Sequence, residues 1–193
     1  MTLSAVLTEP GPLWTGSSSS VQLILAAERL FAEQGIDGVS LRRIGAEAQN
    51  ANNSAVRYHF GSKEGLIQAI LEYRIPGLNR RRQLLAAQAR VDDLRSCVEA
   101  YLLPIIEEAE AEDSYYMSFL VQLQCYGAGV HPFDRLPEHL RATTQSFIGH
   151  IADLLPGVPP SVRSLRIGQV LTICVHASAD RGKIGRASCR ERV

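Results

Sequence analysis

The sequence has few of the features that mark secreted, metal-binding or membrane proteins. Its cysteines form no Cys-x-x-Cys pair and no Cys/His spacing typical of a metal site. No apolar run approaches the roughly 20 residues that cross a bilayer, and nothing resembles a secretory signal. These absences predict a cytoplasmic protein without membrane contact, with four reduced thiols at Cys97, Cys125, Cys174 and Cys189.

Catalytic and metal-binding patterns are equally scarce. No Ser, His or acidic residues form a recognisable set of nucleophile, base and acid. The histidines at His131, His150 and His176 do not have the spacing of metal ligands. We therefore expect no enzyme activity, no metal and no cofactor.

Net charge is also absent, because 20 Lys and Arg balance 20 Asp and Glu. The distribution is more informative than the total. Residues 40–63 hold four basic residues against one acid, a local net charge of +3. Such a cluster is a modest electrostatic footprint for nucleic acid, although a charged helix face is often only a solvated one. With 193 residues, 46% of them hydrophobic, the chain is long enough for one compact protein of two subdomains.

The same segment is expected to form two short helices, of which the first begins after Ser40. Ser40 is a good N-cap, and Leu41, Ile44 and Ala48 recur at a helical spacing that predicts a buried stripe. Arg42 and Arg43 fall off this stripe, so we expect both to face outward.

The second helix is expected over residues 53–60, after a turn over 49–53 that contains three Asn. Asn52 is its predicted cap, and Val56 and Phe60 are its predicted inward residues. Amide, hydroxyl, methyl and guanidinium groups on the outward side can read base edges in a major groove. The outward residues are Asn53, Ser54, Ala55 and Arg57. Together the two helices predict a helix-turn-helix.

Further helices are predicted on both sides. One runs from a cap at Ser19 or Ser20 to Gln34 and ends at Gly35. Another starts at Ser62 and ends near Tyr73, where the following Pro and Gly at 76–77 predict a break and a domain boundary. Beyond it the pattern remains helical, without strand alternation. We expect helices over 78–90, 93–112 with a bend at its proline, 115–126, 137–155 and from 161 onward.

Three stretches carry a family resemblance: LILAAERLFAEQG from Leu23 to Gly35, SLRRIGAEA from Ser40 to Ala48, and YHFGSKEGL from Tyr58 to Leu66. In this order and spacing they resemble the N-terminal domain of the tetracycline-repressor (TetR) family of bacterial regulators. The resemblance covers about residues 19–71. The chain departs from the pattern in a turn one residue longer and without its common glycine, in Arg57 where many members have an aromatic, and in Gln22 where a basic residue is frequent.

The resemblance implies an all-α fold, in which a three-helix helix-turn-helix head is joined by a fourth helix to a helical ligand-binding and dimerisation body. It also implies a sequence-specific transcriptional regulator, most often a repressor. Two copies would pair through their last two long helices on a palindromic operator of double-stranded DNA, and a small-molecule effector of unknown identity would bind in the body. The alternative is a TetR-like helical interaction module that has lost operator recognition.

The resemblance also assigns residues. Bases would be contacted by the outward residues of the second helix, and phosphates by the residues around it. The predicted DNA-binding residues are Ser40, Arg42, Arg43, Asn52, Asn53, Ser54, Ala55, Arg57, Tyr58, His59 and Lys63. For Ser40, Arg42, Arg43 and Tyr58, a structural or merely solvated role remains an alternative.

Effector binding is predicted for aromatic and polar residues near the bend at Pro104, with core packing as the alternative for each. These are Cys97, Tyr101, Tyr115, Tyr116, Met117, Phe119, Gln122, Tyr126, Phe133 and His150. Their apolar bias points to a lipophilic effector.

The sequence divides into a flexible arm (1–18), a DNA-binding domain (19–76), a ligand-binding and dimerisation domain (77–182) and a tail (183–193). The tail ends in GRASCRERV, which matches one reading frame of a common sequencing adapter. We therefore expect residues 183–193 to be non-native and the last helix to be truncated; a basic native tail is the alternative.

Overall fold

The computed structural model describes residues 16–48, 55–126 and 136–190, and all secondary structure in these ranges is helical. This confirms the predicted all-α fold. The helices are α2 (Ser18–Gln34), α3 (Leu41–Glu47), α4 (Ala55–Phe60), α5 (Lys63–Gln88), α6 (Leu94–Glu110), α7 (Tyr116–Cys125), α8 (Glu138–Asp153) and α9 (Pro160–Arg190).

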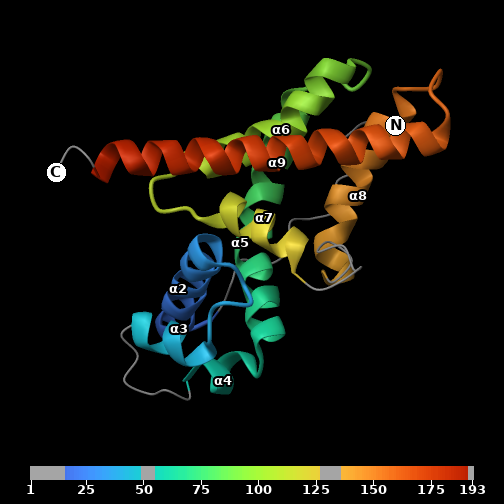
Figure 1. The fold of residues 1–193 in the computed structure, drawn as a ribbon. Helices are drawn as coiled ribbons and strands as arrows, with labels where there is room; N and C mark the ends of the chain where they lie inside the picture. The colour runs from blue at the N-terminus through green and yellow to red at the C-terminus, as the bar shows by residue number, and fades with distance from the viewer. Residues whose placement is uncertain (1–15, 49–54, 127–135, 191–193) are drawn as a thin grey trace.

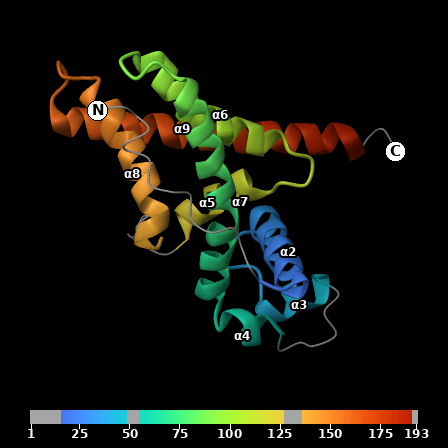
Figure 2. The same ribbon diagram turned by 180° about the vertical axis from the view of Figure 1, so that it is seen from behind.

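The helices form a head and a body. Helices α2, α3 and α4, the head, gather at one end of the molecule, and α5 rises from them into the body, which is made of α6 to α9 (Figure 1). The long α9 crosses the end of the molecule far from the head, as the view from behind also shows (Figure 2). Helix α5 is therefore the one helix of the described chain that belongs to both parts.

Head and body share one continuous hydrophobic core. Helix α2 packs along α7, and the fully buried rings of Phe31 and Phe119 stack there with centroids 6.2 Å apart. The phenol ring of Tyr116 also stacks against Phe119, with centroids 6.2 Å apart. Because close-packed interiors transmit displacement, a movement of α7 in the body must be felt by α2 in the head.

Side-chain caps mark the starts of several helices. The Ser40 hydroxyl accepts a hydrogen bond from the Arg43 amide at 3.2 Å, and the Asp93 carboxylate accepts one from Ser96 at 3.0 Å. Helix α2 begins slightly earlier than expected, because Ser17 rather than Ser19 or Ser20 is its cap. It ends at Gly35, whose φ of 78° lies in the left-handed region that favours glycine.

The predicted helix break at residues 76–77 is wrong, because α5 continues through Pro76 to Gln88. A proline inside a helix costs about 3 kcal/mol, since it removes a hydrogen bond and crowds the preceding turn. Packing offsets this cost: Ile75, Pro76 and Leu78 are all buried, and α5 contacts α2 and α4 as well as α6 and α8. The domain boundary at 76–77 thus falls inside a helix and remains a prediction.

Some sequence predictions lie outside the described residues. They include the Asn-rich turn, most of the predicted arm and the loop before α8, at 49–54, 1–15 and 127–135. Within the described ranges, no helix has the length and apolar character that a membrane span needs.

Candidate nucleic-acid interface and effector cavity

Helix α3 is held against the head by one side. Ile44 is fully buried, while Arg42 and Arg43 are exposed as predicted. Gly45 is buried where α3 meets α4, and a Cβ built on it would lie 3.8 Å from the Val56 side chain. The two helices therefore touch through small and branched apolar groups, and the arginines of α3 are left in solvent.

Helix α4 presents a polar, basic face to solvent. Val56 is 1% exposed and anchors the helix, whereas Arg57 and His59 are exposed and Tyr58 is 84% exposed. The Tyr58 and His59 rings meet edge to face at a centroid distance of 5.2 Å. An aromatic side chain with so little packing stabilises the fold weakly, so Tyr58 is available for contact with a partner.

The junction between α4 and α5 fixes how α4 projects. Gly61 has a φ of 72°, which turns the chain sharply, and Ser62 caps α5 by accepting the Gly65 amide at 3.1 Å. A Cβ on Gly65 would lie only 2.1 Å from the Phe60 carbonyl oxygen. The close approach of the two helices therefore requires glycine at position 65.

Two polar contacts hold charged side chains in the head and at the start of α5. Glu47, the one acid between residues 40 and 63, is paired with Arg29 of α2. Lys63 is half-buried, and its ammonium donates to the Ile36 carbonyl oxygen at 2.8 Å. This bond fastens the start of α5 to the loop after α2, a structural role that the sequence did not predict.

The described part of the predicted DNA-binding set lies on one part of the head. Its exposed members are Ser40, Arg42, Arg43, Arg57, Tyr58 and His59, and its half-buried member is Lys63. Asn52, Asn53 and Ser54 and the side chain of Ala55 lie outside the described residues. Contacts of all these residues with DNA stay predictions.

The body contains a cavity of about 300 Å³ between α5, α6, α7, α8 and α9. Tyr101, Tyr116 and Met117, all among the predicted effector residues, line it. Half of the other lining residues are aliphatic, and most of the rest are uncharged polar side chains of Gln and Thr. Two arginines, Arg82 of α5 and Arg141 of α8, also line the cavity and were not predicted.

Of the other predicted effector residues, none that the structure describes lines this cavity. Phe119 is core, and the fully buried Cys97 thiol donates to backbone carbonyl oxygens. Nε2 of His150 lies 2.9 Å from the Val91 carbonyl oxygen, and the Tyr126 hydroxyl donates to Glu64 at 2.9 Å. Gln122 approaches Gly35 of the head. The Tyr115 amide donates to the Glu28 carboxylate of α2. Phe133 lies outside the described residues.

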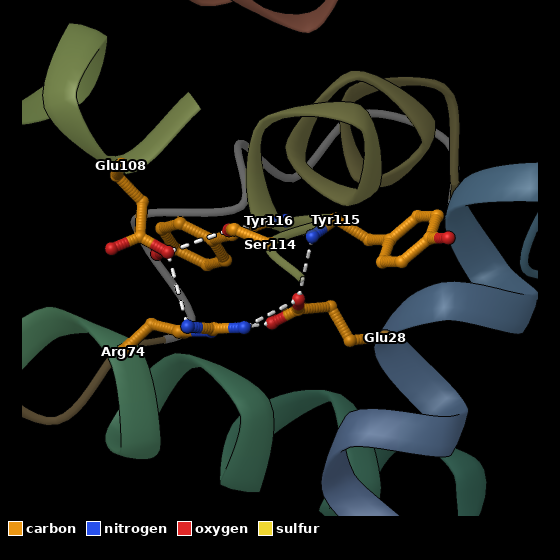
Figure 3. A network of polar contacts seen from close by, with 6 residues as sticks. All are labelled: Glu28, Arg74, Glu108, Ser114, Tyr115 and Tyr116. Atoms are coloured by element: carbon orange, nitrogen blue, oxygen red, sulfur yellow. Dashed lines mark hydrogen bonds and ion pairs between the residues drawn. The ribbon is translucent and has the colours of Figure 1, made fainter. Parts of the chain in front are cut away.

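A partly buried polar network joins the head to the body (Figure 3). Arg74 of α5 donates two hydrogen bonds to the Glu28 carboxylate of α2, at 2.7 and 2.8 Å, and one to Glu108 of α6 at 3.0 Å. Glu108 also accepts from the Ser114 hydroxyl at 2.6 Å, and Glu28 accepts from the Tyr115 amide at 3.0 Å. The network therefore ties α2, α5 and α6 to the start of α7.

Burial makes this network energetically important. The Glu28 side chain is 1% exposed and that of Arg74 is 16% exposed. Burial alone would lower the pKa of the Arg74 guanidinium, but the hydrogen bonds and charge of Glu28, with the charge of Glu108, raise it instead. Burial, followed by the negative charge of Glu28, raises the pKa of the Tyr116 phenol. The Tyr116 amide donates to the Ser114 hydroxyl of the network at 3.3 Å, and Tyr116 also lines the cavity, so this residue borders both.

The sequence contains signals for two buried charged residues that were not predicted, Arg82 and Glu28. Ile75, Leu78 and Arg82 recur at i, i+3 and i+7, so Arg82 falls on an apolar stripe. Glu28 follows Ile24 by four residues on the stripe of α2 in the same way. A charged residue on an apolar stripe indicates a buried charge with a specific partner.

The described ranges hold no group of three or more His, Cys, Asp or Glu arranged to bind a metal.

Comparison with known proteins supports the reading of the head. Residues 23–70 match the family model of the tetR family of bacterial regulatory proteins. A structure of NalD, the secondary repressor of the MexAB-OprM multidrug efflux pump in Pseudomonas aeruginosa, shares the fold. It has 23% identity and a TM-score of 0.54, over 87% of this chain and 85% of that one.

A second NalD structure, of the native protein, has 20% identity, the same coverage and a TM-score of 0.48. No curated protein matches the chain by sequence.

Proposed function

Because residues 23–70 make this chain a member of the tetR family of bacterial regulatory proteins, which are DNA-binding transcriptional regulators and not enzymes, we propose that it is a homodimeric repressor. In this proposal it works in the cytoplasm and leaves a palindromic operator when a small molecule fills the body cavity. NalD, which has the same fold, is a repressor.

The observation that carries the proposal is the outward face of α4. Val56 anchors the helix in the core, and the next three residues, Arg57, Tyr58 and His59, face solvent. In the proposed complex α4 enters the major groove, and residues 53–55 with Arg57 contact bases. Ser40 and Arg42 with their neighbour Arg43, and Tyr58, His59 and Lys63, contact phosphates. Phosphate contacts orient the head, and base contacts supply specificity.

Dimerisation is supported by the surface of α9. Large apolar side chains on this helix are exposed, at Val162, Leu165, Val170 and Ile173. Such side chains are common at interfaces when they cluster. A second copy of α8 and α9 would cover them, and two heads at a fixed spacing would contact enough base pairs for useful specificity.

Release by an effector is supported by the polar network between cavity and head. Tyr116 lines the cavity, and its amide donates to the Ser114 hydroxyl at 3.3 Å. Ser114 donates to Glu108, which binds Arg74, and Arg74 binds Glu28 of the head. An effector shifts the operator equilibrium only if it favours one head position over another. Displacement of α7 by a bound molecule provides that preference.

The test is a gel-shift titration with the DNA upstream of the gene. Arg57→Ala should weaken sequence-selective binding by roughly tenfold to a hundredfold, because a base-contacting arginine is lost. Arg95→Ala is the matched control: Arg95 is an exposed arginine of the body, with a side chain 85% exposed. It removes the same charge and should leave operator affinity unchanged. Affinity of the unchanged protein should fall steeply with salt.

A dimeric protein that shows no sequence-selective shift would contradict the proposal. It would favour the alternative, a helical interaction module with the family fold but without operator recognition. Equal losses in Arg57→Ala and Arg95→Ala would point to nonspecific attraction between the protein and DNA.

A further inference from the structure

Arg82 brings a permanent positive charge into the cavity wall. Its side chain is only 6% exposed. Its Nε donates to the Tyr101 carbonyl oxygen at 3.3 Å, and its Nη1 donates to the Asn79 Oδ1 at 3.2 Å. The guanidinium also lies over the Tyr101 ring, 4.2 Å from its centroid. All of these partners are neutral.

No described carboxylate compensates this charge. Arg82 makes no ion pair with any described acid, and neither Asp nor Glu is among the described residues that line the cavity. A buried charge without a counter-charge is costly. Neutral acceptors and an aromatic face reduce this cost, but they leave a net positive charge beside an empty volume.

Arg141 adds a second donor to the same wall. Its Nη2 donates to Glu138 at 2.6 Å, at an exposed carboxylate, while its buried Nε has no hydrogen-bond partner. A buried donor without a partner also costs free energy. Since Glu138 balances the charge of Arg141, the cavity carries one positive charge in excess, that of Arg82.

The rest of the wall suits an apolar body. Tyr101, Tyr116, Met117, Leu120 and Val175 line the cavity together with further aliphatic side chains, and two Gln and two Thr add uncharged polar groups. A volume of about 300 Å³ is at the small end of the range for pockets that bind organic molecules. A guanidinium binds a planar carboxylate well, through parallel N–H donors.

We propose that the cavity binds a small amphipathic anion, namely an organic acid whose carboxylate pairs with Arg82 and Arg141 and whose apolar body fills the remaining volume. As an assignment of the effector class, this rests on the proposed function, but the binding chemistry is independent of DNA. A cationic or uncharged molecule of the same shape leaves the Arg82 charge uncompensated and binds more weakly.

Isothermal titration calorimetry without DNA tests the charge preference. The probes are octanoate, octanol and octylamine, which share one alkyl chain, and naphthoate with naphthamide as a rigid pair. Each carboxylate should bind at least about tenfold more tightly than its uncharged or cationic counterparts. Equal or tighter binding of octanol or octylamine would overturn the proposal, and so would no binding of any probe.

Arginine variants locate the preference. Arg82→Met keeps an apolar side chain of similar length and should weaken octanoate binding by about tenfold or more without weakening octanol. Arg141→Met should weaken octanoate as well, and it decides the result if Arg82→Met fails to fold. Arg81→Met is the control, because Arg81 binds Glu107 on the surface and does not line the cavity. Unchanged octanoate binding in the folded cavity variants contradicts the proposal.

A separate operator-release assay distinguishes this proposal from the proposed function. If octanoate binds through Arg82 but does not release DNA, the cavity chemistry stands and the cavity's role as effector site fails. If the operator is released only by uncharged or cationic molecules, the repressor function stands and the anion assignment fails.

Discussion

Charged side chains on α3 and α4 of the head are exposed to solvent, whereas several in the body and between the two parts are buried. In the head, Arg57 and its neighbour Tyr58 face solvent, and only apolar groups such as Val56 anchor the helix that carries them. In the body and at its joint with the head, Arg82 and Glu28 are almost completely buried. An exposed cation is suited to a large, flat polyanion such as DNA, whereas an enclosed cation selects a small anion that fits its cavity.

The difference in burial between these charges has an energetic consequence. Removing an exposed charge in the head changes the binding of a partner and leaves the fold nearly intact. Removing one partner of a buried pair leaves the other charge uncompensated inside the protein. The joint between the two parts should therefore be the place where single substitutions cost most stability.

The largest effect is expected for Arg74→Met. Glu28, with a side chain 1% exposed, would lose both hydrogen bonds from Arg74. Leaving such a carboxylate unpaired costs about 3 to 5 kcal/mol, which thermal denaturation should show as a lower midpoint. Protein concentration must be constant, because the midpoint of a dimer depends on it.

The matched control is Arg81→Met. Arg81 is on the same helix and also donates two hydrogen bonds to a glutamate of α6, Glu107, but the side chains of that pair are 47% and 44% exposed. Exposed pairs contribute little, so the midpoint should remain close to that of the unchanged protein. Equal losses in the two variants would remove the proposed difference between joint and surface.

A smaller effect is expected for Gly65→Ala. The new methyl group would meet the Phe60 carbonyl oxygen, 2.1 Å from the ideal Cβ position. This backbone oxygen moves only with α4, so we expect a loss of about 1 to 3 kcal/mol in the free energy of unfolding. Gel shifts should show weaker operator binding by the folded fraction, because α4 is displaced.

The smallest effect, with the opposite sign, is expected for Gly77→Ala on the same helix. A Cβ at Gly77 would meet nothing within 4 Å, and alanine favours a helix interior by about 1 kcal/mol over glycine. The variant should therefore be slightly more stable in thermal denaturation. A destabilised Gly77→Ala would contradict a continuous α5.

Local signals in the sequence predicted the head well. The cap at Ser40 and the burial of Ile44 follow from spacing alone, because a short helix on a core needs one cap and one apolar stripe. The end of the helix that leads from the head into the body was predicted less well. Pro76 is a strong local signal for a break, but burial on several sides of α5 outweighed it, and such packing is not visible in a local pattern.

The cavity in the body was predicted only in part, again because packing between distant helices is not visible in a local pattern. Its wall combines α5 to α9, so residues such as Arg82 and Arg141 come together only in the folded chain. Aromatic content indicated Tyr101 and Tyr116 correctly as lining residues, but it also suggested Phe119, which fills the core instead. Composition identifies apolar side chains without showing which of them border empty space.

In the proposed complex, two copies of α4 enter successive major grooves. Methylation protection of guanine N7, a major-groove atom, tests it directly on the DNA fragment that the protein shifts. We expect two protected patches separated by about 10 base pairs, one helical turn, or by a multiple of that distance. Binding without protection of guanine N7, or with protection confined to minor-groove adenine N3, would contradict it.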